Sequence, residues 1–305
     1  GGLGGARRGR GGAPRPLDWS RHTTRHVALQ LQYLGWPFHG FAAQGGGVEE
    51  TVEAALFAAL RRTRLVPESA NWSEMGYSRC GRTDKGVSAL GNVVALRLRS
   101  ARPPAAEPWD DAREMDYVAV LNRALPPEVR VLGWAPAPEG FSARFSCAWR
   151  HYRYFFPLHA GLDVERMRGA AARMVGHHDF RNFCKMDVAQ VHSFERRMLS
   201  VEVARDDAGG SVCGDPLYYF SIRGTAFLWH QVRCMAAVLL MVGEGKEEPS
   251  VVDELLDVGR TPRKPTYQMA PEEPLLLWRC GFESGVLPPW RCSPEAAAAL
   301  QQHAG

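Results

Sequence analysis

The sequence predicts an α+β protein, in which mainly antiparallel strands form a central sheet and helices pack against it. Segments of alternating apolar residues, typical of half-buried strands, recur along the whole chain. Several of these strands follow one another without the helix that a parallel crossover needs. With 305 residues, of which 45% are hydrophobic and 23% charged, the chain is long enough for one large domain or for two lobes that share a cleft.

The first half of the chain contains four predicted strands and two predicted helices. Residues 26–33, "HVALQLQY", alternate apolar and polar side chains and predict the first strand. Thr51 is a favoured helix N-cap, and the apolar repeat that follows it predicts a helix over 51–63. The same two patterns predict a strand at 92–99, a helix at 117–125, and strands at 129–136 and 150–156.

The second half repeats these patterns, with helices predicted at 163–175, 228–242 and 249–257 and strands at 196–204, 217–224 and 275–282. A weak internal repeat, in which a strand leads into Gly-x-x-Phe at 35–38 and again at 224–227, favours two related lobes. We therefore divide the chain into a disordered Gly/Arg-rich arm at 1–20, an N-terminal lobe at 26–150, a C-terminal lobe at 151–285 and a C-terminal tail at 286–305.

Composition permits a nucleic-acid partner without establishing one. The formal net charge is only +4, but 33 of the 37 basic residues are arginine, the side chain best suited to bind phosphate and to stack on bases. The seven cysteines are scattered and lack the spacing of a zinc site, so we expect reduced, mostly buried thiols. No run of eighteen apolar residues exists, and no membrane association is expected.

The segment "SRCGRTDKGV", residues 78–87, places one carboxylate, Asp84, in a basic turn flanked by glycines. An Asp two residues before a Gly is most often a simple turn residue. A second interpretation is an acid that acts on a polyanion held by the neighbouring bases. Arg233 bears on this choice, because it lies in the largely apolar segment "FLWHQVRCMAAVLLMVG" and a buried charge needs a partner. Asp84 is a candidate for that partner.

Two other groups of residues have structural interpretations beside the functional ones. Tyr152 and Tyr154 share one face of a predicted strand, where packing is the commoner role. His177, His178 and Asp179 suggest metal ligands, but adjacent side chains diverge and no third ligand follows at a useful spacing. A loop that ends the preceding helix is the better prediction for this segment.

Four motifs occur in a specific order: "GRTDKGV" at 81–87, "ARFSCAWRHYRYFF" at 143–156, "GHHDFRNFCKMD" at 176–187 and "GTAFLWHQVRCM" at 224–235. Together they resemble the TruA family of tRNA pseudouridine synthases, from about residue 26 to about residue 282. The residues within these motifs are most similar to those of the eukaryotic branch that modifies positions 38 and 39 of the tRNA anticodon stem-loop. The resemblance implies a pseudouridine synthase fold, with two lobes around the central sheet and a basic cleft.

The resemblance also implies roles for individual residues. Asp84 is the expected catalytic carboxylate, since a carboxylate suits the charge that develops at an anomeric carbon. Arg233 is expected to keep Asp84 ionised, Arg82 to fill the gap left by a flipped uridine, and Tyr152 to stack on the uracil. Whether Asp84 attacks C1′ or removes a C2′ proton stays open. Residues predicted to bind RNA are Arg79, Lys85, Arg150, Lys185, Phe227, His230 and Gln231.

The implied reaction needs no cofactor and no metal. The expected partner is tRNA, a homodimer is a plausible assembly for this family, and a cytoplasmic or nuclear location, or both, is the family expectation. Two alternatives stay open. One is a catalytically silent tRNA-binding protein or chaperone on the same fold, and the other is a glycoside hydrolase that would need a second carboxylate such as Glu195 or Asp179 beside Asp84.

Overall fold

The computed structural model describes residues 17–42, 50–104, 111–185 and 192–292. Most of the predicted arm at 1–20 and of the predicted tail at 286–305 therefore lies outside the described residues. The described part of the arm contains a 3-10 turn at Trp19–Arg21. The described part of the tail includes a short strand, β11 (Arg291–Cys292).

The structure is α+β, as predicted, with one large sheet and few helices. The strands are β1 (Thr24–Tyr33), β2 (Ser78–Arg79), β3 (Ser88–Arg99), β4 (Val129–Pro136), β5 (Cys147–Pro157), β6 (Gly176–Asp179), β7 (Glu195–Arg205), β8 (Ser211–Val212), β9 (Asp215–Gly224), β10 (Leu275–Phe282) and β11. The α-helices are α1 (Val52–Arg62), α2 (Tyr117–Asn122), α3 (Val164–Arg173), α4 (Gln231–Gly243) and α5 (Val251–Leu256).

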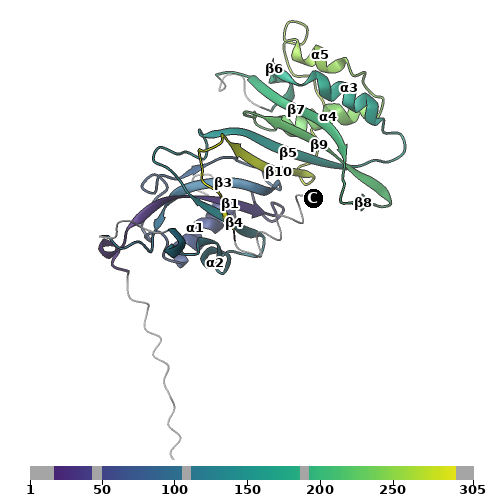
Figure 1. Ribbon diagram of the computed structural model, residues 1–305. Coiled ribbons are helices and arrows are strands. Elements are labelled where there is room, and N and C mark those ends of the chain that lie inside the picture. Colours follow the sequence, from purple (N-terminus) through teal and green to yellow (C-terminus); the bar gives the residue numbers. More distant parts are fainter. Residues whose placement is uncertain (1–16, 43–49, 105–110, 186–191, 293–305) are drawn as a thin grey trace, which may run out of the picture.

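The main path of the sheet runs β11-β4-β1-β3-β10-β5-β9-β7-β6, with β2 paired to β3 and β8 paired to β9. Among the described strands, the pairs are antiparallel except for β3 with β10, which run parallel. The late strand β10 lies between β3 and β5 and joins the two halves of the molecule (Figure 1). The prediction of a mainly antiparallel central sheet is confirmed.

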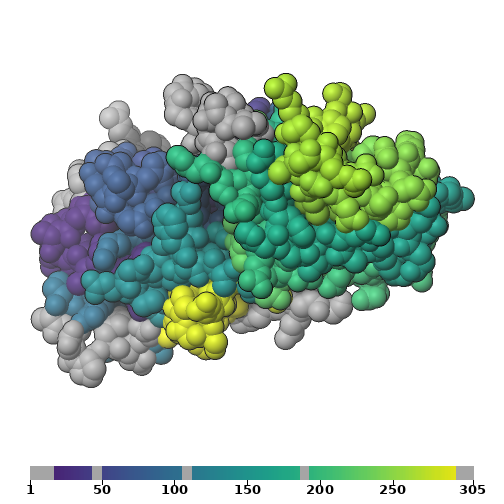
Figure 2. Space-filling model, turned by 90° about the horizontal axis from the view of Figure 1, so that it is seen from above, coloured from purple at the N-terminus to yellow at the C-terminus, as the bar shows by residue number. Residues whose placement is uncertain are grey.

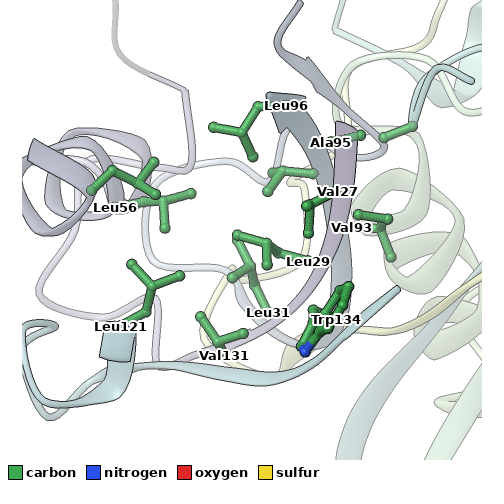
Figure 3. Close-up of a cluster of buried hydrophobic side chains, with 14 of the residues drawn as sticks. Val27, Leu29, Leu31, Leu56, Val93, Ala95, Leu96, Leu121, Val131 and Trp134 are labelled. Atoms are coloured by element: carbon green, nitrogen blue, oxygen red, sulfur yellow. The ribbon is translucent and has the colours of Figure 1, made fainter. Parts of the chain in front are cut away.

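The buried apolar residues form two clusters, one in each half of the molecule. The first lies between α1, α2 and the strands β1, β3 and β4, where Leu29, Leu56 and Val131 point toward one another (Figure 3). The second lies between β5, β7 and β9 on one side and α3, α4 and α5 on the other. Each half thus has its own core, and the continuous sheet connects them.

Local sequence explains the ends of the helices. Thr51 caps α1 as predicted, because its hydroxyl accepts a hydrogen bond of 3.2 Å from the backbone N–H of Ala54. Asp163 caps α3 in the same way. The start of α4 differs from the prediction of residue 228: His230 has left-handed backbone angles, with φ of 61°, so the helix begins at Gln231.

One segment contradicts the sequence interpretation. Residues 176–179, which we expected to be a loop after a helix, form β6 and pair with β7 at the edge of the sheet. The strand is too short to show a periodic pattern, and only its partner reveals it. Among the described residues, no helix is long and apolar enough to cross a membrane.

Candidate active site

A cavity of about 1190 Å³ brings together residues from both halves of the chain. Figure 2 shows the two halves side by side, the N-terminal half in purple and blue and the C-terminal half mainly in green. The catalytic turn, which we define as residues 78–87, forms one wall of the cavity, and β5 and the segment that leads into α4 contribute to the others. Nine of the predicted site residues line it: Arg79, Arg82, Asp84, Arg150, Tyr152, Phe227, His230, Gln231 and Arg233.

Buried polar side chains hold the catalytic turn in place. The amide of Asn92, on β3, accepts a hydrogen bond from Gly81 N–H at 3.0 Å and donates one to Gly81 C=O at 3.1 Å. The hydroxyls of Tyr33 and Thr83 hydrogen-bond at 2.8 Å, and Asn92 also donates to the Tyr33 hydroxyl at 3.2 Å. Because Asn92 is fully buried, this network fixes the turn from the side of the protein interior.

Two glycines are required by the shape of the turn. Gly86 has φ of 79°, in the region that residues with a side chain rarely adopt. At Gly35, a Cβ atom would lie 2.1 Å from the carbonyl oxygen of Val87, so only glycine allows the β1 end to approach the turn this closely. Gly35 belongs to the first copy of the weak repeat, which therefore contacts the site directly.

Asp84 lines the cavity and is partly buried and hydrogen-bonded. Its Oδ1 accepts a hydrogen bond of 3.0 Å from the indole N–H of Trp229, and its side chain is 24% exposed. Burial raises the pKa of Asp84 above the ordinary value, while the Trp229 hydrogen bond and the charge of Arg233 act to lower it. The carboxylate is therefore close to a cation without being fully desolvated.

His230 lies 3.5 Å from Asp84, measured from Nε2 to Oδ2. Burial and the nearby positive charges of Arg233, Lys185 and Lys264 lower the pKa of His230 to about 4. The imidazole is therefore neutral at physiological pH, and the pair is not an ion pair there.

Arg233 does not form the direct ion pair with Asp84 that the sequence suggested. Its Nη2 donates to the carboxylate of Glu272 at 2.7 Å, and its Nε donates to the carbonyl of Ala270 at 2.8 Å. The general expectation was right, since this buried arginine does have a carboxylate partner. The partner was misidentified because Asp84 and Glu272 both lie near the guanidinium, and sequence does not rank them.

Tyr152 and Phe227 form an aromatic corner of the cavity. Their ring centroids lie 5.0 Å apart at an interplanar angle of 82°, and Tyr152 pairs with Ile222 on β9 and Leu277 on β10. Burial raises the pKa of Tyr152 well above its usual value. The phenol is therefore neutral, with its hydroxyl able to donate, and its ring edge-on to Phe227.

Arg150, predicted to bind RNA, connects three backbone segments. Its guanidinium donates to the carbonyl of Cys80 at 3.1 and 3.3 Å, of Arg144 at 3.0 Å and of Thr225 at 2.7 Å. Cys80 belongs to the catalytic turn and Thr225 to the segment before α4. Arg150 thus ties the two walls of the cavity together.

Positive charge and exposed aromatic rings gather at the cavity. Arg79 forms an ion pair with the buried Glu53, and the pKa of Arg82 is lowered by burial and by the neighbouring charges of Arg79 and Arg144. Crowding of cations in this way favours an anionic ligand. Phe145, which sequence reasoning did not select, is 81% exposed and lines the same cavity.

Three predicted RNA-binding residues differ from the rest. Gln231 lines the cavity but is only 1% exposed, and its side-chain oxygen accepts a 2.8 Å hydrogen bond from Leu228 N–H, which closes the turn before α4. Lys85 and Lys185 are exposed and do not line the cavity. The backbone N–H of Lys185 donates to the carbonyl of Trp229 at 3.2 Å. Lys185 therefore contacts the residue whose indole donates to Asp84, rather than the cavity itself.

The seven cysteines are free thiols, and five of them are buried, so the prediction of mostly buried cysteines is confirmed. The described residues hold no group of three His, Cys, Asp or Glu side chains arranged to bind a metal ion. Trp229, Asn92 and Glu272 were also missed by sequence reasoning. Their contacts with the turn are all long-range, and no local pattern marks them.

Comparisons with known proteins show which family this chain is similar to. A family described as tRNA pseudouridine synthase matches residues 170–283. The tRNA pseudouridine(38/39) synthase of Bos taurus is 50% identical over 291 residues, which cover 90% of this chain and 60% of that protein. The tRNA pseudouridine synthase A of Methanothrix thermoacetophila is 36% identical over 256 residues, which cover 84% of this chain and 83% of that protein.

The crystal structure of the archaeal box H/ACA sRNP Nop10-Cbf5 complex matches 71% of this chain and 44% of that chain at 13% identity, with a TM-score of 0.34. The sequence relatives carry the assignment, because the archaeal relative is matched over most of its own length. This chain therefore belongs to the tRNA pseudouridine synthase family.

Proposed function

We propose that this protein isomerises uridine to pseudouridine at positions 38 and 39 of the tRNA anticodon stem-loop. The observation that carries the proposal is Asp84, a partly buried carboxylate in a cavity that is also lined by Arg79, Arg82 and Arg144. The similarity to tRNA pseudouridine(38/39) synthases supports the choice of positions. Because the chain spans 60% of the length of that relative, substrate and activity are both part of the proposal.

The proposed reaction breaks the bond between N1 of uracil and C1′ of the ribose and forms a bond between C5 and C1′. The C5 proton leaves to solvent and N1 gains a proton, so the product is an isomer of the substrate. Asp84 acts as the carboxylate, either at C1′ or on the C2′ proton. Tyr152 provides its ring for stacking on the uracil and a neutral hydroxyl beside it, and the pKa of its phenol, raised by burial, argues against a phenolate base.

The cleft has the features that RNA recognition requires. Its arginines suit phosphate oxygens, and the exposed rings of Phe145 and Trp229 offer surfaces for stacking on bases. A buried carboxylate reaches only a nucleotide that has left its stack. Unstacking costs least where pairing is weakest, and the last stem pair and first loop nucleotide on the 3′ side of the anticodon arm are such places.

The test is release of tritium from tRNA labelled at uracil C5. We expect release from tRNAs with uridine at 38 or 39, and little release when those two positions alone are cytidine. Asp84→Asn should abolish release while tRNA binding stays nearly intact, because the arginines supply the affinity. Residual turnover above about one per cent of the wild-type rate would show that another residue performs the chemistry.

The same assay separates the alternatives. Comparable release from uridines of the T-arm or from poly-U would contradict the choice of positions. Binding of tRNA with no release from any uridine would favour a silent RNA-binding protein. A glycoside hydrolase is not favoured, since neither Asp179 nor Glu195 lines the cavity and Asp179 forms an ion pair with Arg181.

A homodimer that uses the sheet face opposite the cavity is part of the proposal. On that face the guanidinium of Arg153 lies 3.6 Å from the ring centroid of Trp278, and that of Arg223 lies 3.8 Å from that of Trp149. The buried Nε atoms of both arginines have no hydrogen-bond partner among the described residues, which supports a second surface covering them. Sedimentation of the wild type against a variant with Arg153→Glu tests this assembly.

A cytoplasmic or nuclear location is likewise proposed, on the ground that tRNA of the expected kind is present in both compartments. Imaging of the tagged full-length protein tests it.

A further inference from the structure

Glu272 occupies a position that neither the proposed chemistry nor the sequence patterns explain. It lies in the segment just before β10, outside the lining of the cavity, and its side chain is 33% exposed. Its carboxylate nevertheless pairs with Arg233, the arginine whose charge acts on Asp84. A carboxylate that competes for this cation affects the catalytic group without touching the substrate.

The segment 270–275 clasps Arg233 at several points. The backbone N–H of Ala270 donates to the carbonyl of Arg233 at 3.4 Å, and the carbonyl of Ala270 accepts from Arg233 Nε at 2.8 Å. Glu272 Oε2 accepts from Arg233 Nη2 at 2.7 Å. The carbonyl of Glu272 accepts from Leu275 N–H at 3.0 Å, where β10 begins and where Leu275 lines the cavity.

The stem of Glu272 also contacts the catalytic turn. A Cβ atom on Gly86 would lie 2.9 Å from Cγ of Glu272, so the backbone of Gly86 and this side chain are in close contact. Glu272 thus touches the turn that carries Asp84, holds the cation that faces Asp84, and precedes the strand that completes the cavity. We propose that Glu272 is a positioning residue that fixes the guanidinium of Arg233 against the catalytic turn and away from a direct ion pair with Asp84. The inference rests on the proposed function for its catalytic meaning.

The consequence is electrostatic. The charged and titratable groups around Asp84 are Arg233 on α4, His230 just before α4, Tyr152 on β5 and Glu272, with Arg82 and Lys85 on its own turn. Within this set, Glu272 raises the pKa of Asp84 and Arg233 lowers it. Glu272→Gln keeps the stem and removes the negative charge, so Arg233 acts on Asp84 unopposed and the pKa of Asp84 falls.

The first experiment needs no turnover. Because the Trp229 indole donates to Asp84, the part of the tryptophan emission that is lost in the Trp229→Phe variant reports protonation of Asp84 as the pH is varied. In Glu272→Gln the midpoint should move to lower pH by about 0.5 to 1 unit, because a nearby charge that is largely screened by water is worth about 1 kcal/mol. The matched control is Glu273→Gln, which removes the same charge from the exposed neighbour and should leave the midpoint unchanged.

The second experiment is the pH profile of tritium release. Activity needs ionised Asp84 and falls as the pH drops through its pKa, so a lowered pKa moves the acidic limb to lower pH. Below the wild-type midpoint, Glu272→Gln should retain about three to ten times more of its plateau activity than the wild type, which corresponds to the same shift. Because the pKa of His230 is about 4, the shift must persist in a His230→Asn background.

The two failures are distinguishable. A wild type that releases no tritium contradicts the proposed function, and the fluorescence titration still decides the role of Glu272. Coinciding titrations for the wild type and Glu272→Gln overturn the inference even if the enzyme is active. If Glu272→Gln does not fold, the variant Glu272→Asp replaces it, because it keeps the negative charge on a shorter side chain that cannot hold the Arg233 guanidinium in the same place. A wild-type kcat in Glu272→Asp would show that the reaction does not depend on this placement of Arg233, and would overturn the inference.

Discussion

Arg150 offers the sharpest test of how the cleft is built. The sequence predicted an RNA contact, whereas in the structure its guanidinium donates to the carbonyls of Cys80, Arg144 and Thr225. Arg150→Met keeps most of the aliphatic stem and removes every donor. If these hydrogen bonds are the main role of the residue, the substitution acts on stability and on the geometry of the cavity before it acts on RNA affinity.

The magnitude follows from the contacts. A hydrogen bond to a backbone carbonyl contributes about 1 kcal/mol net, so three carbonyls amount to about 3 kcal/mol of unfolding free energy. For a chain of this size with an m-value near 3 kcal/mol/M, this is a decrease of about 1 M in the urea midpoint. Arg150→Lys should recover only part of the loss, because a single ammonium group cannot donate to all three carbonyls as the planar guanidinium with its several N–H groups does.

The assay combines urea unfolding with tRNA binding over a range of salt concentrations. We expect a lower urea midpoint in Arg150→Met and a salt slope equal to that of the wild type. A contact to phosphate gives the opposite pattern, in which the slope decreases by about one and the midpoint is retained. That second pattern would refute the structural role of Arg150.

Two further predictions follow from exposure and charge. Phe145→Ala should raise the KM for tRNA about 5- to 150-fold, which is the range for loss of one stacked base. Phe145→Trp should retain affinity, and Leu199→Ala, at an exposed position on β7, is the control. An unchanged KM in steady-state kinetics of Phe145→Ala would exclude stacking. Burial lowers the pKa of His151 and of His230 to about 4, so the unfolded chain binds more protons than the folded protein between pH 6.5 and 4. The melting temperature should therefore fall steadily as the pH drops through that range. A melting temperature that is constant over this range in the wild type, or that falls as steeply in a variant with both histidines replaced by Gln, would contradict the prediction.

Much of the architecture was predictable because its signals are local. The strands β4 and β10 were predicted with their observed bounds, since each is a mainly apolar segment bordered by turn residues. The setting of Asp84, a lone acid among bases and glycines, is visible in a few adjacent positions, but a simple turn is the commoner meaning of that pattern and the expected role of Asp84 came from the resemblance. The gathering of Arg82, Tyr152 and Arg233 at one cavity agrees with the resemblance rather than with any spacing.

The remainder depended on contacts between distant segments. Asn92 is an ordinary polar residue in its strand, and only the folded turn shows why its amide is buried. The exposure of Phe145 could not be predicted either, because an aromatic residue in an apolar motif is more often buried. For Arg233, the rule that a buried charge needs a partner was correct, but choosing between Asp84 and Glu272 requires the path of the segment before β10.

The position of β10 has a consequence for synthesis of the chain. Because β10 lies between β3 and β5, the strands on either side of it are made long before the strand that joins them. Until residues 275–282 leave the ribosome, β5 presents an unpaired edge, and Ser88 and Ala89 of β3 lack their partners although β2 already pairs with β3 farther along. During that time the catalytic turn and Arg233 belong to halves that β10 has not yet joined. The nascent chain is therefore exposed to edge-to-edge association late in translation, and release of a chain ending before residue 275 should yield aggregation rather than a smaller working enzyme.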